Sequence, residues 1–432
     1  MLLWLWAQLL WSQAALAGGG AIHELLPWLS SLGVVVEPVV VQDAGLGPGL
    51  FSTRAIRQGE VYLNIPYRLA MGPDHALRDP VLAPLLAPLL ARARARPQEQ
   101  LGDCTLTLLQ LLHERAKGAR SLWRPYIAAM PRAHLAFSEC EPSVWMPPGL
   151  RRYCDAMVPQ HEAEFARLDE TPLLETVLRM PGAAFAAERW RAYRWALGMT
   201  LSRAQGPIYP NSTRSCWLTP GLDMHNHRLG AHDGRGPIRP MSLDYGAAGL
   251  HAGIAAPRPI AGGVEIMTEY HGARKCQHEI LLAYGFVPRD EPSRECLPVS
   301  APRDDRLVHF IDAAGTAPPA LLRQLAAAPG AAPPGGIDAL ETAPPMVVFS
   351  LLALLQKIAR QYGGGGGVGG GGGGGRLSKQ RAVRPPTLLS GARCGGLTGA
   401  PTHCSTFQTL WASEQRVLQA AIARVEARIK GL

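Results

Sequence analysis

Residues 216–227 read CWLTPGLDMHNH and end in the pattern D-x-x-N-H. The pattern places the Asp223 carboxylate, the Asn226 carboxamide and the His227 imidazole within about one turn of chain. In the plainest structural interpretation, Asp223 or Asn226 caps a turn. A metal site is disfavoured, because His225 and His227 lack the carboxylate spacing of a catalytic zinc motif. The stretch therefore predicts a polar cluster without a metal ion.

Two other segments carry chemistry of their own. Residues 43–54 read DAGLGPGLFSTR, and their glycines allow the backbone to approach a ligand closely, although a glycine-rich hairpin turn explains them equally well. Residues 260–286 contain Glu265, Tyr270 and a final YGF triplet. Taken alone, Tyr270 is a strand tyrosine, since aromatic residues favour strands.

In this order, the three segments resemble the SET-domain methyltransferases, specifically the branch of Rubisco large-subunit and histidine methyltransferases. The resemblance spans about residues 24–432, and D-x-x-N-H followed by Tyr270 and YGF is its most specific part. Further matching motifs lie in residues 52–60, 121–131, 195–204, 263–286 and 414–421.

The resemblance implies an α+β fold made of two parts. The first is a pseudoknotted, β-rich SET domain over residues 24–290, with a helical insertion at about residues 75–200. The second is an all-helical substrate-binding domain over residues 300–432, interrupted by a glycine-rich insertion at residues 363–375. S-adenosylmethionine is expected on one side of the SET domain, and a protein side chain enters through a narrow channel on the other.

The resemblance also implies roles for individual residues. Tyr270 is the expected catalytic residue at the reacting centre. The expected cofactor-binding residues are Gly47, Pro48, Gly49, Leu50, Asn226, His227, Gly285 and Phe286. The expected substrate-binding residues are Arg203, Asp223 and Tyr284.

Three functions remain open at this point. The first is a protein-lysine N-methyltransferase that acts on a non-histone protein. The second is a protein-histidine N-methyltransferase, which the polar Gln205 close to Arg203 leaves open without favouring it. The third is a catalytically inactive SET-like binding module. The presence of Tyr270, Asn226 and His227 favours an enzyme, because a binding module need not retain the tyrosine.

Composition excludes some other classes of protein. The chain has 432 residues, of which 47% are hydrophobic and 18% charged, so a wholly disordered chain is excluded. The net charge of +9 comes from 43 basic residues, only five of them lysine, and the arginines are scattered without a basic stripe. We therefore expect no nucleic-acid binding. The expected state is a monomer that acts on a protein substrate.

Hydrophobic periodicity predicts the order of the helices and strands. The predicted helices cover residues 24–32, 81–95, 104–117, 144–168, 184–202, 278–284, 307–313, 320–328, 347–362 and 409–429. The predicted strands cover residues 34–41, 51–56, 60–65, 215–218 and 263–270. The glycine run at 363–375 is predicted to be a flexible insertion and not a phosphate loop, because no Gly-Lys-Ser/Thr follows it.

The eight cysteines are widely spaced and include no C-x-x-C pair. This spacing predicts neither a zinc cluster nor a dense disulfide framework.

The N-terminus resembles a targeting signal. Residues 1–22 contain no charged side chain, and ALA at 15–17 is a small-x-small cleavage site, so residues 1–17 are predicted to be a signal-like leader. Gln8, Ser12 and Gln13 disfavour a stable transmembrane span. The asparagine of the sequon at 211–213 matters only if the chain enters the secretory route. Secretory entry, a two-step route to a plastid and the cytoplasm all remain open.

Overall fold

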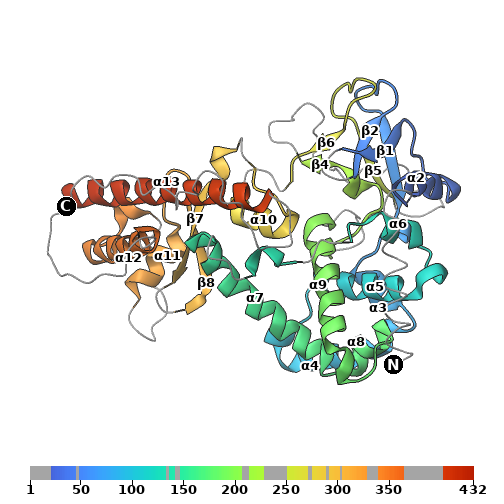
Figure 1. The fold of residues 1–432 in the computed structure, drawn as a ribbon, viewed down its shortest axis with the longest axis horizontal. Coiled ribbons are helices and arrows are strands. Elements are labelled where there is room, and N and C mark those ends of the chain that lie inside the picture. Colours follow the sequence, from blue (N-terminus) through green and yellow to red (C-terminus); the bar gives the residue numbers. More distant parts are fainter. Residues whose placement is uncertain are drawn as a thin grey trace. The chain divides into compact units, whose positions relative to one another are not determined.

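The computed structural model describes residues 21–44, 48–132, 136–141, 146–206, 214–227, 251–270, 275–288, 291–301, 304–327, 339–363 and 402–432. The chain divides into two compact units (Figure 1). The first unit contains residues 1–136 and 164–272, and the second contains residues 137–163 and 273–432. The predicted leader lies outside the described residues.

Short strands form the β-rich part of the first unit. The β-branched run at residues 39–41 begins β1 (Val39–Asp43), which pairs antiparallel with β2 (Pro48–Ser52). On the other side of β2, Phe51 pairs with Glu265 in an isolated bridge. The remaining pairs are β3 (Val61–Pro66) with β5 (His251–Ala255), antiparallel, and β4 (Asn226–His227) with β6 (Met267–Thr268), parallel.

Helices make up the rest of the first unit. They are α2 (Ala21–Ser31), α3 (Pro73–Arg78), α4 (Leu82–Ala95), α5 (Asp103–Lys117), α6 (Arg124–Ala129), α8 (Pro172–Leu178) and α9 (Ala186–Arg203). Helix α5 is the central one, because α3, α8 and α9 all pack against it. Its leucines Leu109, Leu111 and Leu112 have no exposed surface, and each such side chain contributes about 1.5–3 kcal/mol of hydrophobic stabilisation. One of the three boundaries between the units falls within α7 (Pro148–Asp169).

The second unit has a core of its own. The hairpin of β7 (Cys296–Ala301) and β8 (Asp304–Asp312) packs with α11 (Pro319–Ala326), α12 (Pro345–Gly363) and α13 (Thr402–Lys430). The short helix α10 (Gln277–Tyr284) precedes the hairpin. Core side chains include Leu297, Val299, Ile311, Leu321, Leu351, Leu355 and Val417.

One predicted helix is wrong. Residues 307–313 lie mostly in strand β8, where Phe310 pairs with Pro298 and Ile311 with Leu297. The apolar residues of this segment fit both a helical and a strand pattern, and the pairing with β7 decides between them. The second unit is therefore not purely helical. The other predicted helices match observed helices, with ends that differ by a few residues.

Among the cysteines whose side chains are described, three disulfides form, each within one unit. Cys104 pairs with Cys216 in the first unit, whereas Cys140–Cys154 and Cys276–Cys296 lie in the second. Spacing did not predict these pairs, because folding brings together cysteines that are up to 112 residues apart in sequence.

No helix within the described parts of the chain is both long and apolar enough to span a membrane.

Candidate active site

A tight turn presents Asp223 in the first unit. Gly221 has a φ of +84°, a conformation that favours glycine, and it precedes the short 3-10 helix Leu222–Met224. The carbonyl of Thr219 accepts hydrogen bonds from the N–H groups of Leu222 and Asp223 at 3.1 and 3.3 Å. The D-x-x-N-H motif thus begins in a turn whose geometry depends on the TPG sequence before it.

The Asp223 carboxylate is completely buried between an arginine and a tyrosine. Arg203, the last residue of α9, lies with Nη1 3.1 Å from Asp223 Oδ2. The Tyr126 hydroxyl donates a 2.9 Å hydrogen bond to the same oxygen. Burial raises the pKa of Asp223, while Arg203 and Tyr126 oppose that rise by stabilising the carboxylate. Asp223 Oδ1 is buried and makes no hydrogen bond within the described residues.

His225 is held as a neutral imidazole. Its Nδ1 lies 2.8 Å from the Leu222 carbonyl oxygen, which can only accept, so Nδ1 carries the proton. The other nitrogen, Nε2, is 2.9 Å from the Tyr62 hydroxyl, which therefore donates to it. Burial lowers the pKa of His225 to about 4. Hydrogen bonds at both nitrogens thus fix the orientation of the ring within the motif.

Three segments that are far apart in sequence meet at Gly49. The Asn226 amide donates a 2.7 Å hydrogen bond to Glu265 Oε1. A Cβ atom built on Gly49 would lie 2.5 Å from Glu265 Oε1 and 3.0 Å from Asn226 Nδ2. The bridge between Phe51 and Glu265 positions this contact, and the Leu50 carbonyl accepts a hydrogen bond from Ile266 N–H at 2.7 Å. A side chain at position 49 would therefore force the side chains around it to move.

Tyr270 follows β6 and points its hydroxyl at the motif. The hydroxyl donates a 2.7 Å hydrogen bond to the His225 carbonyl oxygen, and the Tyr270 N–H donates to His227 Nδ1 at 3.0 Å. Burial raises the pKa of Tyr270 to about 12, so the phenol is neutral near pH 7. The phenol therefore acts as a hydrogen-bond donor to the backbone of the motif.

The structure brings six of the predicted site residues together through these contacts: Gly49, Arg203, Asp223, Asn226, His227 and Tyr270. Pro48 and Leu50 flank Gly49 in β2. Gly47 lies outside the described residues. Tyr284, Gly285 and Phe286 belong to the second unit, where Gly285 ends α10 with a φ of +80° and the two rings lie 6.2 Å apart. The functional roles of all these residues stay predictions.

Three supporting residues, Tyr62, Tyr126 and His225, were not among those predicted from the sequence. Tyr126 lies in the 121–131 motif and was thus within reach of the resemblance. His225 lies inside D-x-x-N-H, yet its role depends on Tyr62, which is 163 residues away. No local pattern marks Tyr62, a buried residue of β3.

Two groups outside this site bring together ligand types that metal ions use. Cys276, His278 and Cys296 converge in the second unit, where the two sulfurs form a disulfide. Asp79, His113 and Glu114 converge in the first unit, where Lys117 Nζ lies 3.6 Å from Asp79 and also contacts Glu114. The sulfurs of the first group are thus already bonded to each other, and Lys117 pairs with both carboxylates of the second.

Comparisons with known proteins agree with the resemblance. No protein-family model matches the chain. It is 22% identical over 282 residues to the chloroplastic Rubisco large subunit N-methyltransferase of Pisum sativum, a match that covers 63% of this chain and 52% of the pea protein. It is 26% identical over 305 residues to SET domain-containing protein 4 of Mus musculus, covering 67% of this chain and 63% of the mouse protein. The matches thus span less than two thirds of each relative.

Solved structures match nearly the whole chain. The SET domain of LSMT bound to lysine and AdoHcy aligns with a TM-score of 0.65 at 17% identity, covering 95% of this chain and 92% of that one. Rubisco LSMT bound to AdoMet aligns with a TM-score of 0.62 at 18% identity, covering 94% and 92%. The chain shares the LSMT fold. The expected α+β architecture of SET type is therefore confirmed.

Proposed function

We propose that this chain is an S-adenosylmethionine-dependent protein N-methyltransferase that methylates lysine on a non-histone protein. The observation that carries the proposal is the convergence of Gly49, Asn226 and Glu265 beside a Tyr270 phenol anchored on the motif backbone. The shared fold supports it, and so does the similarity to the N-methyltransferase of Pisum sativum.

The groups of the site fit a positively charged cofactor. Glu265 supplies a carboxylate, and the His225 carbonyl and Tyr270 phenol supply further oxygen atoms in a buried setting. S-adenosylmethionine, when bound, supplies an electrophilic methyl group on a sulfonium ion. Asn226 and His227 would hold the cofactor, and Gly49 would let the β2 backbone approach it.

Catalysis in such a site is mainly positioning and electrostatics. Methyl transfer is an in-line displacement in which the bond from carbon to sulfur breaks as the bond to nitrogen forms, so a neutral amine must face the methyl group. The Tyr270 hydroxyl is itself oriented by its hydrogen bond to the His225 carbonyl, and it would lie near the methyl group and the amine nitrogen. Arg203 and Asp223 would shape the substrate side through their buried ion pair.

Incubation with labelled S-adenosylmethionine and a total cell extract tests the proposal. We expect labelled proteins whose hydrolysates contain methyl-lysine, and loss of label with Tyr270→Phe. Methyl-histidine instead of methyl-lysine would select the histidine alternative. Cofactor binding by calorimetry without transfer to any protein would select the inactive binding module, and no binding at all would refute the proposal.

A further inference from the structure

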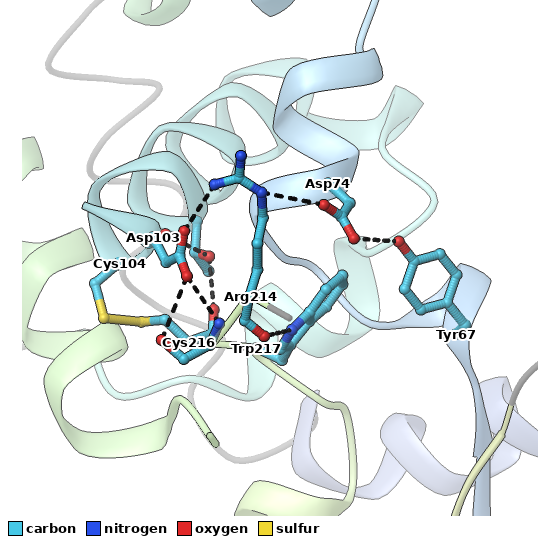
Figure 2. A network of polar contacts seen from close by, with 9 residues as sticks. Tyr67, Asp74, Asp103, Cys104, Arg214, Cys216 and Trp217 are labelled. Atoms are coloured by element: carbon cyan, nitrogen blue, oxygen red, sulfur yellow. Dashed lines mark hydrogen bonds and ion pairs between the residues drawn. A yellow bond between two sulfur atoms is a disulfide. The ribbon is translucent and has the colours of Figure 1, made fainter. Parts of the chain in front are cut away.

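A disulfide connects the central helix of the first unit to the segment that leads into the candidate site. Cys104 lies in the first turn of α5, and Cys216 lies seven residues before Asp223 (Figure 2). Cys104 is exposed, whereas Cys216 is 4% exposed. None of the four cysteines in the other two disulfides is exposed. Cys104 is therefore the only exposed residue among the described cysteines, and its side is the one from which an external thiolate can approach the disulfide.

The other links between α5 and this segment are hydrogen bonds and an ion pair. Asp103 accepts from Ser215 N–H at 2.8 Å and pairs with Arg214 Nη1 at 2.8 Å (Figure 2). The Thr107 hydroxyl donates a 2.6 Å hydrogen bond to the Cys216 carbonyl. Arg214 is partly exposed, so water competes for its ion pairs. The disulfide is the only covalent link among these contacts.

The backbone at Cys216 depends on its surroundings. Its φ is +70°, a left-handed conformation that residues with a side chain rarely adopt. Such a conformation persists where neighbouring contacts hold it, as the disulfide and the Thr107 hydrogen bond do here. Opening the disulfide removes one of the two restraints on this residue.

The segment reaches the site on two sides. Trp217 exchanges two backbone hydrogen bonds with Gln205, at 2.8 and 2.9 Å, two residues beyond Arg203. Leu218 exchanges two with Met71 and leads directly into the turn that presents Asp223. Disorder beginning at Cys216 would therefore loosen both partners of the buried ion pair between Arg203 and Asp223.

We propose that Cys104–Cys216 is a thiol–disulfide exchange site that controls the order of residues 214–227 and, through them, the binding of the cofactor. A thiolate of a dithiol reductant attacks Cys104 Sγ, the bond between the sulfurs breaks, and Cys216 leaves as a thiolate that takes up a proton. The second thiol of the reductant then loses its proton and displaces Cys104 as a thiolate, which is protonated in turn. Two electrons pass to the protein, and the reductant becomes a disulfide. The effect on the cofactor rests on the proposed function.

Peptide-resolved thiol labelling of the purified full chain tests the exchange step. The oxidised protein is equilibrated with dithiothreitol mixtures of rising reducing strength, and exposed thiols are alkylated under native conditions. We expect Cys104 and Cys216 to become labelled before the four cysteines of the other disulfides. Labelling of both cysteines before reduction, or opening of another pair first, would overturn the proposal.

Hydrogen exchange and calorimetry on the same samples test the coupling. Partial reduction that opens only this pair is expected to speed amide exchange in residues 214–227 and to weaken S-adenosylmethionine binding about tenfold, within the usual range of couplings between sites. Cys104→Ser should reproduce both effects, whereas the control C140S/C154S, which removes a disulfide of the second unit, should reproduce neither.

The outcomes separate the two proposals. Unchanged exchange in residues 214–227 after opening of the disulfide would refute the switch. Redox-dependent exchange in a chain that never binds S-adenosylmethionine would support the exchange site while it refutes the proposed function.

Discussion

Replacement of Gly49 by alanine is the sharpest test of the assembled site. The added Cβ would lie 2.5 Å from Glu265 Oε1, about 0.9 Å short of the 3.4 Å at which ordinary contact begins. Ala44 Cβ and Asn226 Nδ2 would lie at 2.9 and 3.0 Å, so neighbours on two sides limit the movement that relieves the clash. A shift of that size at Glu265 breaks its 2.7 Å hydrogen bond with Asn226.

The size of the effect follows from the bond that is lost. A hydrogen bond to a charged group contributes about 1.5–3 kcal/mol. If this loss falls on the site, binding of S-adenosylmethionine weakens about ten- to hundredfold, since each 1.4 kcal/mol or so corresponds to a factor of ten. Calorimetric titration with S-adenosylmethionine and S-adenosylhomocysteine measures the change.

Gly206→Ala is the matched control. Nothing lies within 4 Å of a Cβ built at Gly206, and we expect this variant to bind like the wild type. Denaturant unfolding of both variants separates a local effect from general loss of the fold. A Gly49→Ala protein that is folded and binds the cofactor within twofold of the wild type would refute the reasoning that places residue 49 in the cofactor site.

Three further predictions concern single side chains. Tyr270→Phe is expected to lower kcat about hundredfold with little change in cofactor affinity, because it removes one oriented group at the reacting centre; near-normal turnover would contradict this. Burial lowers the pKa of His225 to about 4, so between pH 6.5 and 4 the unfolded chain binds a proton at this residue that the folded chain does not. The free energy of unfolding should therefore fall by about 3 kcal/mol from pH 6.5 to 4. Unfolding curves of His225→Gln should lack this part of the pH dependence. Glu414→Ala should lower the free energy of unfolding by about 3–5 kcal/mol. The buried Glu414 carboxylate lies 2.6 Å from His278 Nε2 and accepts hydrogen bonds from the N–H groups of Gly149 and Leu150. The control Glu426→Ala, at an exposed position on the same helix, should change the free energy of unfolding by less than about 0.5 kcal/mol.

The sequence predicts those elements whose conformation is decided by residues close to each other in the chain. Helix α5 was predicted within one residue of its observed start, because five leucines within seven residues bury a helix on most of its surface. Strand β8 was predicted to be a helix, since only its pairing with β7 distinguishes the two patterns. The glycines of residues 43–54 were predicted to allow a close approach to a ligand or to form a hairpin turn. In the folded chain, the atoms nearest to Gly49 include those of Asn226 and Glu265, more than 170 residues later, which no local pattern indicates.

The protonation states of the site residues likewise depend on residues that are far apart in the sequence. The D-x-x-N-H motif indicates which groups are present, but not which of them are charged. The neutral state of His225 follows from its burial, which brings Tyr62 against its Nε2, and the setting of Asp223 depends on Tyr126 and Arg203. These partners come from α6, α9 and β3, so only the folded chain assigns the protonation states from which the chemistry follows.

The disulfides provide information about the cellular compartment of the protein, which the signal-like residues 1–17 leave open. Disulfides persist in oxidising compartments, whereas cytosolic thiols are kept reduced. Every cysteine whose side chain is described is paired, which agrees with a signal-like leader. The proposed reaction, however, requires a compartment that contains S-adenosylmethionine. If the working protein resides in a reducing compartment, we expect the pair with the exposed Cys104 to open first, which leaves non-covalent contacts such as those of Asp103 and Thr107 between α5 and residues 214–227. Alkylation of free thiols in intact cells, followed by measurement of the modified fraction of Cys104, therefore shows whether the protein works with the Cys104–Cys216 disulfide closed or open.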